Sequence, residues 1–436
     1  MVRFVQNQNY SKLTTFRSGI EFAHHLDQKD PLASYKDKFH QPKDQHGTPL
    51  IYLCGNSLGL QPKTTAAYIQ QELNDWANLG VEGHLEARNP WLAYHEYLTE
   101  GMATIVGAKP IEVVVMNTLT TNLHLMMVSF YKPTSTRYKI IIEADAFPSD
   151  KYAVESQLRH HGIDESEGLI LWKPKKDDLN HLEDLAQLLE VHGNEVALIM
   201  VGGVNYYTGQ AFDLKRITEL GHQHGCYVGF DCAHGAGNVD LDLHHAGADF
   251  AIWCTYKYLN AGPGSLAGCF VHERHAYDKD LNRFTGWWSH NKKTRFNMRD
   301  EFDVLPGAEG WQLSNPPILS MAAIKASVDL FTAVGMPALI EKSKQLTGYF
   351  EFLLTGLNHP EIRIITPKNP NERGCQLSIQ VRNANKKLHQ KLTAKGVISD
   401  WREPDVIRCA PVPLYNSYTD VYETVQRLAS VLNETN

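Results

Sequence analysis

Two residues near the middle of the chain, a lysine and an aspartate, could together hold an aldehyde cofactor. Lys257 ends the largely apolar run 251–256, and Asp231 ends the run 226–230. An amine at the end of a buried strand is shielded from water, which favours the neutral form that attacks carbonyl groups. Pyridoxal 5′-phosphate needs such a lysine for its aldehyde and a carboxylate beside its ring nitrogen. On spacing alone, a lysine that reaches out to solvent and a helix-capping aspartate are the alternative.

Two polar segments could bind the phosphate and the ring of that cofactor. Residues 117–122 precede an apolar stretch and predict a turn into a helix N-terminus, where backbone amides bind phosphate. An ordinary helix cap is the alternative for this segment. Phe147 opens the segment 147–150 just after a predicted strand, where an aromatic ring can stack on a flat cofactor. The alternative there is a β-turn.

Two further side chains could act on a substrate or on the cofactor ring. Arg408 lies in the apolar segment 406–411, and a buried arginine needs a carboxylate partner. That partner is either the α-carboxylate of a substrate, held by two parallel hydrogen bonds, or an acid of the chain itself. His234 could stack near a ring or bond to the aspartate three residues before it, with a structural histidine as the alternative. Residues 262–268 lack the spacing of a dinucleotide-binding loop and indicate a turn.

The elements that position these residues alternate between short apolar runs and helical patterns. Strands are expected at residues 138–142, 196–201, 227–230, 249–254 and 268–271. Helices are expected at 178–189, which carries leucines on one face, and at 213–224, which begins at an aspartate cap. Buried strands that alternate with helices predict an α/β fold with a mostly parallel sheet, covered on both faces.

After two prolines at 316 and 317 the pattern changes to a smaller α+β arrangement. Helices are expected at 318–333, from 337 onward, at 386–395 and at 420–433, with strands at 362–365 and 376–381. We therefore expect an N-terminal segment, 1–60, that packs with the small domain, a large cofactor-binding domain, 61–318, and a small C-terminal domain, 319–436.

The composition is that of an ordinary globular enzyme. The 436 residues are 43% hydrophobic and 21% charged, and the formal net charge of −7 argues against nucleic acid or an anionic membrane as a partner. Seven cysteines form neither a CxxC pair nor a Cys/His group at zinc spacing, which indicates reduced thiols and no metal. No stretch approaches about 18 uninterrupted apolar residues, and residues 1–7 lack the apolar core of a signal peptide. We expect a cytoplasmic protein.

From about Ile51 to about residue 425 the chain resembles the kynureninase family. Six segments carry the resemblance, at residues 55–63, 147–150, 229–234, 256–262, 314–319 and 408–417. The resemblance implies a pyridoxal-phosphate enzyme of fold type I, the aspartate-aminotransferase-like fold. Such a fold has a large domain with a mostly parallel seven-stranded sheet between helices, and a smaller α+β domain. It also implies a homodimer whose active sites are shared between subunits.

The resemblance also implies roles for individual residues. Lys257 would hold the cofactor covalently, Asp231 would face its ring nitrogen, and Tyr256 would contact its phosphate and act as an acid or base. The implied cofactor contacts are Leu119, Thr120, Phe147, Pro148, Ser149, Asp150, Gly202, Asp231, His234, Tyr256, Lys257, Trp287 and Asn315. Gly202 departs from the family pattern, in which serine is usual, so that only a backbone contact could remain there.

The substrate site implied by the resemblance has two ends. Arg408 would hold the α-carboxylate of the substrate, while His84, Ser314 and Asn315 would line the pocket for its aryl ring. Polar groups there favour 3-hydroxykynurenine, because an apolar pocket would leave the ring hydroxyl unpaired. Asn315 and Trp287 are expected to complete the cofactor site across the dimer interface.

The implied activity is the hydrolytic cleavage of the Cβ–Cγ bond of L-kynurenine, 3-hydroxy-L-kynurenine or both. The products would be anthranilate or 3-hydroxyanthranilate and L-alanine, in tryptophan degradation and NAD biosynthesis. Within the same fold, a cysteine desulfurase or selenocysteine lyase is an alternative, but it needs a reactive loop cysteine and typically a histidine where this chain has Tyr256. A non-catalytic protein of the same fold is a third hypothesis, against which the intact Lys257, Asp231 and Arg408 argue.

Overall fold

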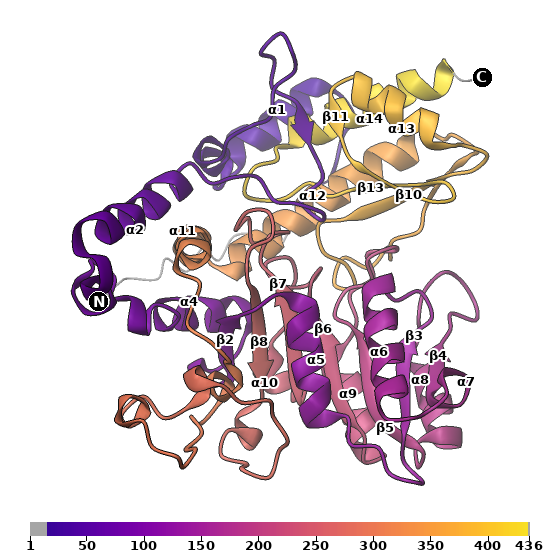
Figure 1. Ribbon diagram of the computed structural model, residues 1–436. Helices are drawn as coiled ribbons and strands as arrows, with labels where there is room; N and C mark the ends of the chain where they lie inside the picture. Colours follow the sequence, from indigo (N-terminus) through magenta and orange to yellow (C-terminus); the bar gives the residue numbers. More distant parts are fainter. Residues whose placement is uncertain (1–14, 435–436) are drawn as a thin grey trace.

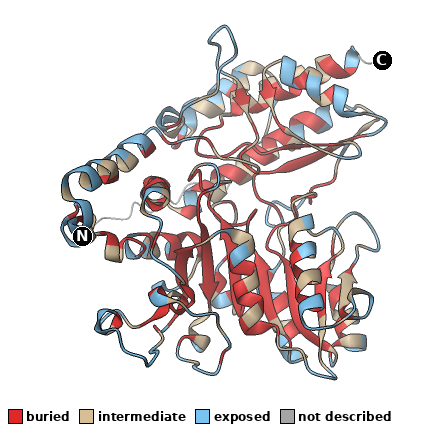
Figure 2. Ribbon diagram, viewed as in Figure 1, coloured by how far each residue is buried: buried red, intermediate tan, exposed pale blue. Residues whose placement is uncertain are grey.

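A computed structural model describes residues 15–434, which form two layered parts (Figure 1). The prediction made for residues 1–7 therefore lies outside the described residues. The larger part is built on a seven-stranded sheet and the smaller part on a four-stranded sheet. Figure 2 shows that most of the larger sheet is buried, as expected for a sheet with helices on both faces, although residues 169–171 of its edge strand are only half-buried.

The seven-stranded sheet has the strand order β2-β8-β7-β6-β5-β3-β4. Its strands are β2 (Val113–Met116), β3 (Lys139–Glu143), β4 (Leu169–Trp172), β5 (Val196–Gly202), β6 (Tyr227–Asp231), β7 (Phe250–Cys254) and β8 (Ala267–Val271). The neighbours from β4 to β7 pair in parallel, and β8 runs antiparallel to both β7 and β2. The predicted α/β fold with a mostly parallel seven-stranded sheet is confirmed, although the sequence patterns did not single out β2 and β4.

Successive residues of each strand contribute to apolar clusters on opposite faces of the sheet. In β3, Ile141 belongs to one cluster and Ile142 to the other. The first cluster includes residues of α8 (Leu182–His192) and α9 (Leu214–Gln223). The second includes residues of α5 (Leu119–Phe130) and α6 (Pro148–His160). The two-residue period of the strands thus sorts side chains between two layers of helices.

Helix α8 begins four residues later than the sequence pattern suggested. The start was expected at residue 178, but the helix begins at Leu182. Residues 175–179 are bends, and Asn180 is held outside the helix, because its side chain donates to the Trp172 carbonyl at 2.9 Å and its backbone amide donates to the Gln210 side chain at 3.0 Å. The leucine spacing was correct, but it carried no information about these long-range bonds.

The smaller part is an antiparallel sheet with helices. Its strand order is β12-β13-β10-β9. The strands are β9 (Ile362–Ile364), β10 (Leu377–Val381), β12 (Asp400–Arg402) and β13 (Val406–Cys409), and the helices are α12 (Met336–Gly356), α13 (Lys386–Ala394) and α14 (Tyr418–Asn433). These elements share one buried apolar cluster.

Helix α11 (Ile318–Val334) leads from the larger sheet to α12. It packs against α2 (Thr65–Leu79) and α4 (Glu96–Val106) of the larger part. Among residues 15–434, no single helix is long and apolar enough to cross a membrane. By length and composition only α11 and α12 taken together pass that test, and the chain bends by 81° between them.

The N-terminal segment packs against the C-terminal part. Strand β1 (Ile51–Tyr52) pairs in parallel with β11 (Val397–Ile398). Helix α1 (Ile20–Lys29) packs against α14, and its Ala23 lies in the apolar cluster of the smaller part. In Figure 1 the indigo start of the described chain accordingly lies beside its yellow end.

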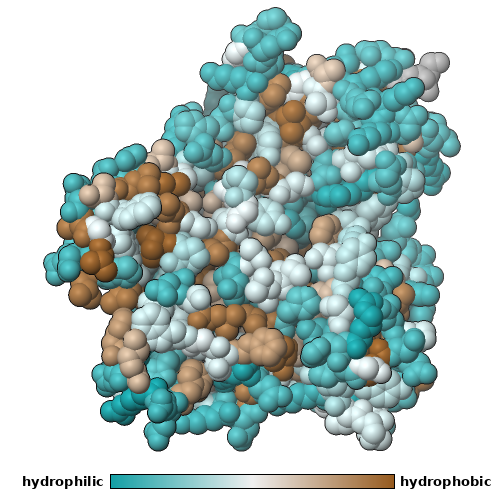
Figure 3. All heavy atoms as spheres, viewed as in Figure 1, coloured by the Kyte–Doolittle hydropathy of each residue, from teal (hydrophilic) through white to brown (hydrophobic). Residues whose placement is uncertain are grey.

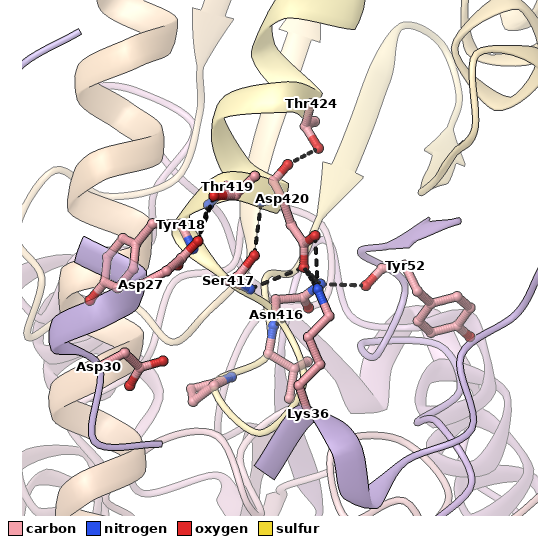
Figure 4. Close-up of polar contacts among 12 residues, drawn as sticks. Asp27, Asp30, Lys36, Tyr52, Asn416, Ser417, Tyr418, Thr419, Asp420 and Thr424 are labelled. Atoms are coloured by element: carbon pink, nitrogen blue, oxygen red, sulfur yellow. Dashed lines mark hydrogen bonds and ion pairs between the residues drawn. The ribbon is translucent and has the colours of Figure 1, made fainter. Parts of the chain in front are cut away.

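Polar contacts reinforce this packing at the start of α14 (Figure 4). Asp27 accepts hydrogen bonds from the backbone amides of Tyr418, at 2.6 Å, and Thr419, at 3.1 Å. Lys36 forms an ion pair with Asp420 at 2.8 Å. The carboxylate of Asp27 thereby satisfies amides that have no partner within the helix.

Candidate active site

A cleft lies where the parallel strands of the larger sheet end. Glu143, Gly202 and Asp231 are the last residues of β3, β5 and β6, and all three line it. The carboxyl edge of an open α/β sheet is the usual place for ligands. The cleft is lined by Leu119, Thr120, Glu143, Phe147, Ser149, Asp150, Gly202, Val204, Tyr206, Asp231, Ala233, His234, Tyr256 and Lys257. Most of the predicted cofactor residues therefore meet at one place.

Lys257 follows the end of β7 and points its amine into this cleft. The amine lies 3.1 Å from Nε2 of His234 and 5.8 Å from the centre of the Phe147 ring. His234 is buried, and burial, followed by the charge of Lys257, holds the pKa of its imidazole well below the usual value. His234 is thus a neutral imidazole that faces the lysine amine.

Asp231 and Asp150 form a buried acidic pair in the floor of the cleft. Burial raises the pKa of Asp231, with the charge of Lys257 acting in the opposite direction. Burial and the charge of Asp231 raise the pKa of Asp150 well above its usual value, and the two carboxyls share a hydrogen bond. Of the two carboxyls, Asp150 is the one whose protonated form this hydrogen bond favours. The amide of Ala233 also donates to Asp231 at 2.7 Å, but residues 233–238 form a turn and no helix starts there, so the helix-capping alternative is wrong.

Gly202 leaves room for the side chain of Glu143. The amide of Gly202 donates to the two carboxyl oxygens of Glu143 at 3.1 and 3.2 Å. A Cβ atom at position 202 would lie 2.9 Å from one of these oxygens. Burial raises the pKa of Glu143 to about 7. The space around a side chain at position 202 is thus taken by a buried acid.

The first turns of α5 and α6 meet at the predicted phosphate site. Helix α5 begins at Leu119, and the side chain of its N-cap residue, Thr118, makes no capping bond. The hydroxyls of Thr120 and Ser149 lie 3.2 Å apart and join the two helices. Pro148 is the first residue of α6, so the segment is a helix start rather than a separate β-turn, and Pro148 itself is not among the cleft residues. Free amides at this end of α5 suit a phosphate dianion.

Two aromatic residues complete the wall of the cleft. Burial raises the pKa of Tyr256, which also hydrogen-bonds to Cys254, so its hydroxyl keeps its proton in the ligand-free protein. The ring of Tyr206 meets that of Phe147 edge to face at 5.3 Å. Sequence reasoning did not single out Tyr206, Glu143, Val204 or Ala233. Position after a strand end, the signal used for Phe147, could also have identified Glu143 and Tyr206.

Arg408 lies behind this wall and is not among the cleft residues. Its Nη1 donates to the carbonyl of Tyr206 at 2.7 Å, which places the guanidinium next to the cleft. Its Nη2 forms an ion pair with Asp400, a residue that sequence reasoning also missed. The internal salt bridge considered as an alternative is therefore present in the ligand-free chain.

Besides Pro148 and Arg408, four predicted residues do not line the cleft of their own chain, namely His84, Trp287, Ser314 and Asn315. His84 bonds to the carbonyl of Val81 at 2.9 Å, and Trp287 donates to a carbonyl at 3.4 Å. Trp287, Ser314 and Asn315 are exposed. A single chain therefore brings together the lysine, the carboxyl groups and the predicted phosphate-binding groups of the site. It does not place the residues predicted to bind the aryl ring in the same cleft.

Solved structures share this fold at low sequence identity. The cysteine desulfurase CsdA from Escherichia coli matches with a TM-score of 0.75 at 16% identity, over 92% of this chain and 98% of that chain. A mutant of C-DES with glycine linked to its PLP cofactor matches with a TM-score of 0.73 at 18% identity, over 87% of this chain and 96% of that chain. These likenesses show the fold alone.

Sequence comparison gives much closer relatives. The family model described as "Kynureninase C-terminal domain" matches residues 339–428. A kynureninase of Myxococcus xanthus is 58% identical, over 95% of this chain and 97% of its own length. A kynureninase of Koribacter versatilis is 53% identical, over 96% of this chain and 99% of its own length. The chain belongs to the kynureninase family.

Proposed function

We propose that the cleft binds pyridoxal 5′-phosphate and that the enzyme hydrolyses L-kynurenine, 3-hydroxy-L-kynurenine or both. The observation that carries the proposal is the convergence of the Lys257 amine, the Asp231–Asp150 pair and the start of α5 on one cleft. Within the described part of the chain, one buried oxygen of Asp150 has no hydrogen-bond partner and the N-cap side chain of α5 makes no capping bond. Both features fit a ligand that carries a ring nitrogen and a phosphate.

Each part of the cofactor has a matching group in the cleft. Lys257 would hold its aldehyde, and Phe147 would cover a face of its ring. Asp231 would accept a hydrogen bond from its protonated ring nitrogen, an interaction strengthened by the negative charge. Leu119 and Thr120 would bind its phosphate at the start of α5. When bound, the cofactor supplies an electron sink for the negative charge that forms at the substrate α-carbon.

The side chains then have distinct tasks in the reaction. Water adds across the Cβ–Cγ bond, so that the aryl carbonyl leaves as anthranilate and the three-carbon fragment leaves as alanine. The Lys257 amine removes the α-proton and later returns a proton to the fragment, and Tyr256, which keeps its hydroxyl proton, is the second proton donor. Arg408 holds the α-carboxylate from behind the Tyr206 carbonyl. The imidazole of His234, whose pKa burial holds well below the usual value, lies beside the amine as a neutral hydrogen-bonding partner.

We also propose that the enzyme works as a homodimer in which the second copy contributes Trp287 and Asn315, with His84 and Ser314 at the aryl end. Support comes from the absence of these residues from the lining of their own cleft and from exposed apolar side chains. The large exposed ones include Trp76, Val81, Leu85, Phe284, Phe296 and Met298. Figure 3 shows apolar side chains gathered on the flank that carries α2. A patch of this kind marks an interface more often than a free surface.

Light scattering on matched variants tests the dimer. The double variant Trp76→Glu, Leu85→Glu should lower the molar mass in solution and the activity together. Tyr152→Glu changes an equally exposed aromatic side chain on α6 and should alter neither. A wild-type chain that is monomeric and fully active would overturn the shared site.

The reaction is tested with cofactor-saturated protein and two kinds of substrate. L-kynurenine should give anthranilate and alanine in equal amounts. L-cysteine should give no sulfide above background, because burial raises the pKa of Cys232, Cys254, Cys375 and Cys409 and leaves their thiols protonated. Sulfide release without anthranilate would favour a desulfurase instead.

A further inference from the structure

The guanidinium of Arg408 is paired with a carboxylate of the chain itself, that of Asp400. Asp400 lies on β12, the edge strand of the smaller sheet, directly across the antiparallel pair from Arg408 on β13. One oxygen of Asp400, Oδ2, accepts from three side chains. The donors are Nη2 of Arg408, the hydroxyl of Ser57 at 2.5 Å and Nη2 of Arg402 at 3.1 Å.

These contacts use the part of Arg408 that a second carboxylate would need. Nη2 donates to Asp400 and lies 3.4 Å from the Ser57 hydroxyl, while Nη1 donates to the Tyr206 carbonyl. A guanidinium can hold a carboxylate by two parallel bonds along the Nε–Nη2 edge or the Nη1–Nη2 edge. Both edges include Nη2. Nη2 has two N–H donors, and Asp400 and Ser57 already contact it, so a substrate carboxylate held by two bonds would compete with Asp400 for this nitrogen.

The burial of Arg408 indicates how the carboxylates of Asp400 and of the substrate could bind it in turn. The Arg408 side chain is 1% exposed, and its Nε has no hydrogen-bond partner among residues 15–434. Asp400 is its ion-pair partner within these residues, and removing it without a replacement would leave an uncompensated buried charge. Asp400 is 12% exposed, and its other cation, Arg402, is 35% exposed. Asp400 can therefore leave Arg408 and keep a charged partner, while Arg408 needs a new carboxylate at the same time.

We propose that Asp400 is paired with Arg408 until substrate binds, and that the α-carboxylate of the substrate then displaces it. Asp400 would keep its ion pair with Arg402 alone. This inference rests on the proposed role of Arg408 in substrate binding. It makes Asp400 a specificity residue, because only a ligand with a carboxylate can replace it. A neutral ligand of the same shape would leave Arg408 buried and unpaired.

Binding of two matched probes to the cofactor-loaded enzyme tests the exchange. The first probe is the kynurenine analogue that lacks the α-amine and so cannot react, and the second is its primary amide. Asp400→Asn removes the competing charge and keeps the side-chain shape, so it should bind the carboxylate analogue at least about tenfold more tightly than the wild type does. The primary amide should bind Asp400→Asn no more tightly than it binds the wild type. Calorimetry measures both affinities without turnover.

Thermal stability gives a second measure of the same exchange. Without a ligand, Asp400→Asn should melt at a lower temperature than the wild type, because Arg408 loses its ion pair. The carboxylate analogue should raise its Tm more than that of the wild type, and the amide should not. Asp30→Asn, which breaks the buried ion pair of Asp30 with Lys342 at 2.7 Å, is the matched control. Its Tm should also fall, but the analogue should bind it as it binds the wild type.

Variants of the arginines separate this inference from the proposed function. Arg402→Gln alone should weaken analogue binding, because the displaced Asp400 carboxylate then has no second cation to pair with. In the Asp400→Asn background the same change should have no effect, because no carboxylate is displaced. If Asp400→Asn binds the analogue as weakly as the wild type or more weakly, the exchange is wrong. If Arg408→Gln binds the analogue as the wild type does, Arg408 is not the carboxylate site and the proposed substrate pose fails as well.

Discussion

The amine of Lys257 and Nε2 of His234 lie 3.1 Å apart, although both are basic groups. They can share this contact because burial keeps His234 neutral, so that its ring nitrogen can accept a hydrogen bond from the lysine amine. Asp231 and Asp150, whose pKa values are raised by burial, line the same cleft. The cleft thus brings the lysine amine together with a neutral imidazole and a buried pair of carboxyl groups.

Asp231→Asn should weaken both cofactor binding and turnover. Asparagine has nearly the same shape, but it carries no charge to hold a proton on the cofactor ring. We expect cofactor affinity to fall by about tenfold to a hundredfold and kcat by at least as much. Absorbance titration measures the affinity and initial rates measure kcat. Asp240→Asn, an exposed aspartate outside the cleft, should change neither value. Unchanged kcat in Asp231→Asn would remove this residue from the ring-nitrogen site.

Glu143 should make the cofactor-free protein lose stability as the pH rises. Its pKa is raised from 4.5 to about 7, so between these values the unfolded chain releases a proton that the folded chain keeps. The free energy of unfolding falls across this window, by roughly 3 kcal/mol for a shift of this size. Glu143→Gln should remove that slope, and Glu190→Gln, on the exposed surface of α8, should keep it. The measurement is the free energy of unfolding by denaturant, taken at pH values from 4.5 to 7 for the wild type and both variants. Identical slopes in all three proteins would mean that Glu143 ionises normally.

His84→Ala should change substrate preference more than it changes overall activity. If His84 lines the aryl end of the site of the second copy, its loss removes a partner for the ring hydroxyl and leaves the ring itself bound. We expect kcat/KM for 3-hydroxy-L-kynurenine to fall by about tenfold relative to L-kynurenine. Parallel initial-rate measurements give the ratio. A ratio equal to that of the wild type would exclude His84 from the aryl pocket.

Local patterns predicted the fold and the cleft well, because both depend on strand ends. A residue that ends a buried parallel strand must lie at the carboxyl edge of the sheet, which is why Asp231 and Lys257 were found. Phe147 follows the same rule. Gly202 also ends a strand, but the rule does not explain why this residue is a glycine. A glycine there has meaning only once the bulk of Glu143, from another strand, is known to lie beside it.

Long-range partners account for what the sequence did not reveal. Asp400 and Arg408 are near in sequence, yet their pairing depends on the register of β12 and β13 and on Ser57, more than three hundred residues away. The start of α8 was misplaced for a similar reason, since Asn180 is held by residues of two other segments. No spacing within one segment encodes such contacts.

Replacing Lys257 by alanine tests the central claim most directly. The measurement is the release of anthranilate and alanine from L-kynurenine by cofactor-saturated wild type, Lys257→Ala and the surface control Lys151→Ala. We predict equal amounts of both products from the wild type and the control, and release slowed by roughly a thousandfold or more in Lys257→Ala. The near-visible absorption of lysine-bound cofactor should be lost only in Lys257→Ala. Product release at the wild-type rate from Lys257→Ala, or none from a wild type that shows this absorption, would contradict the account.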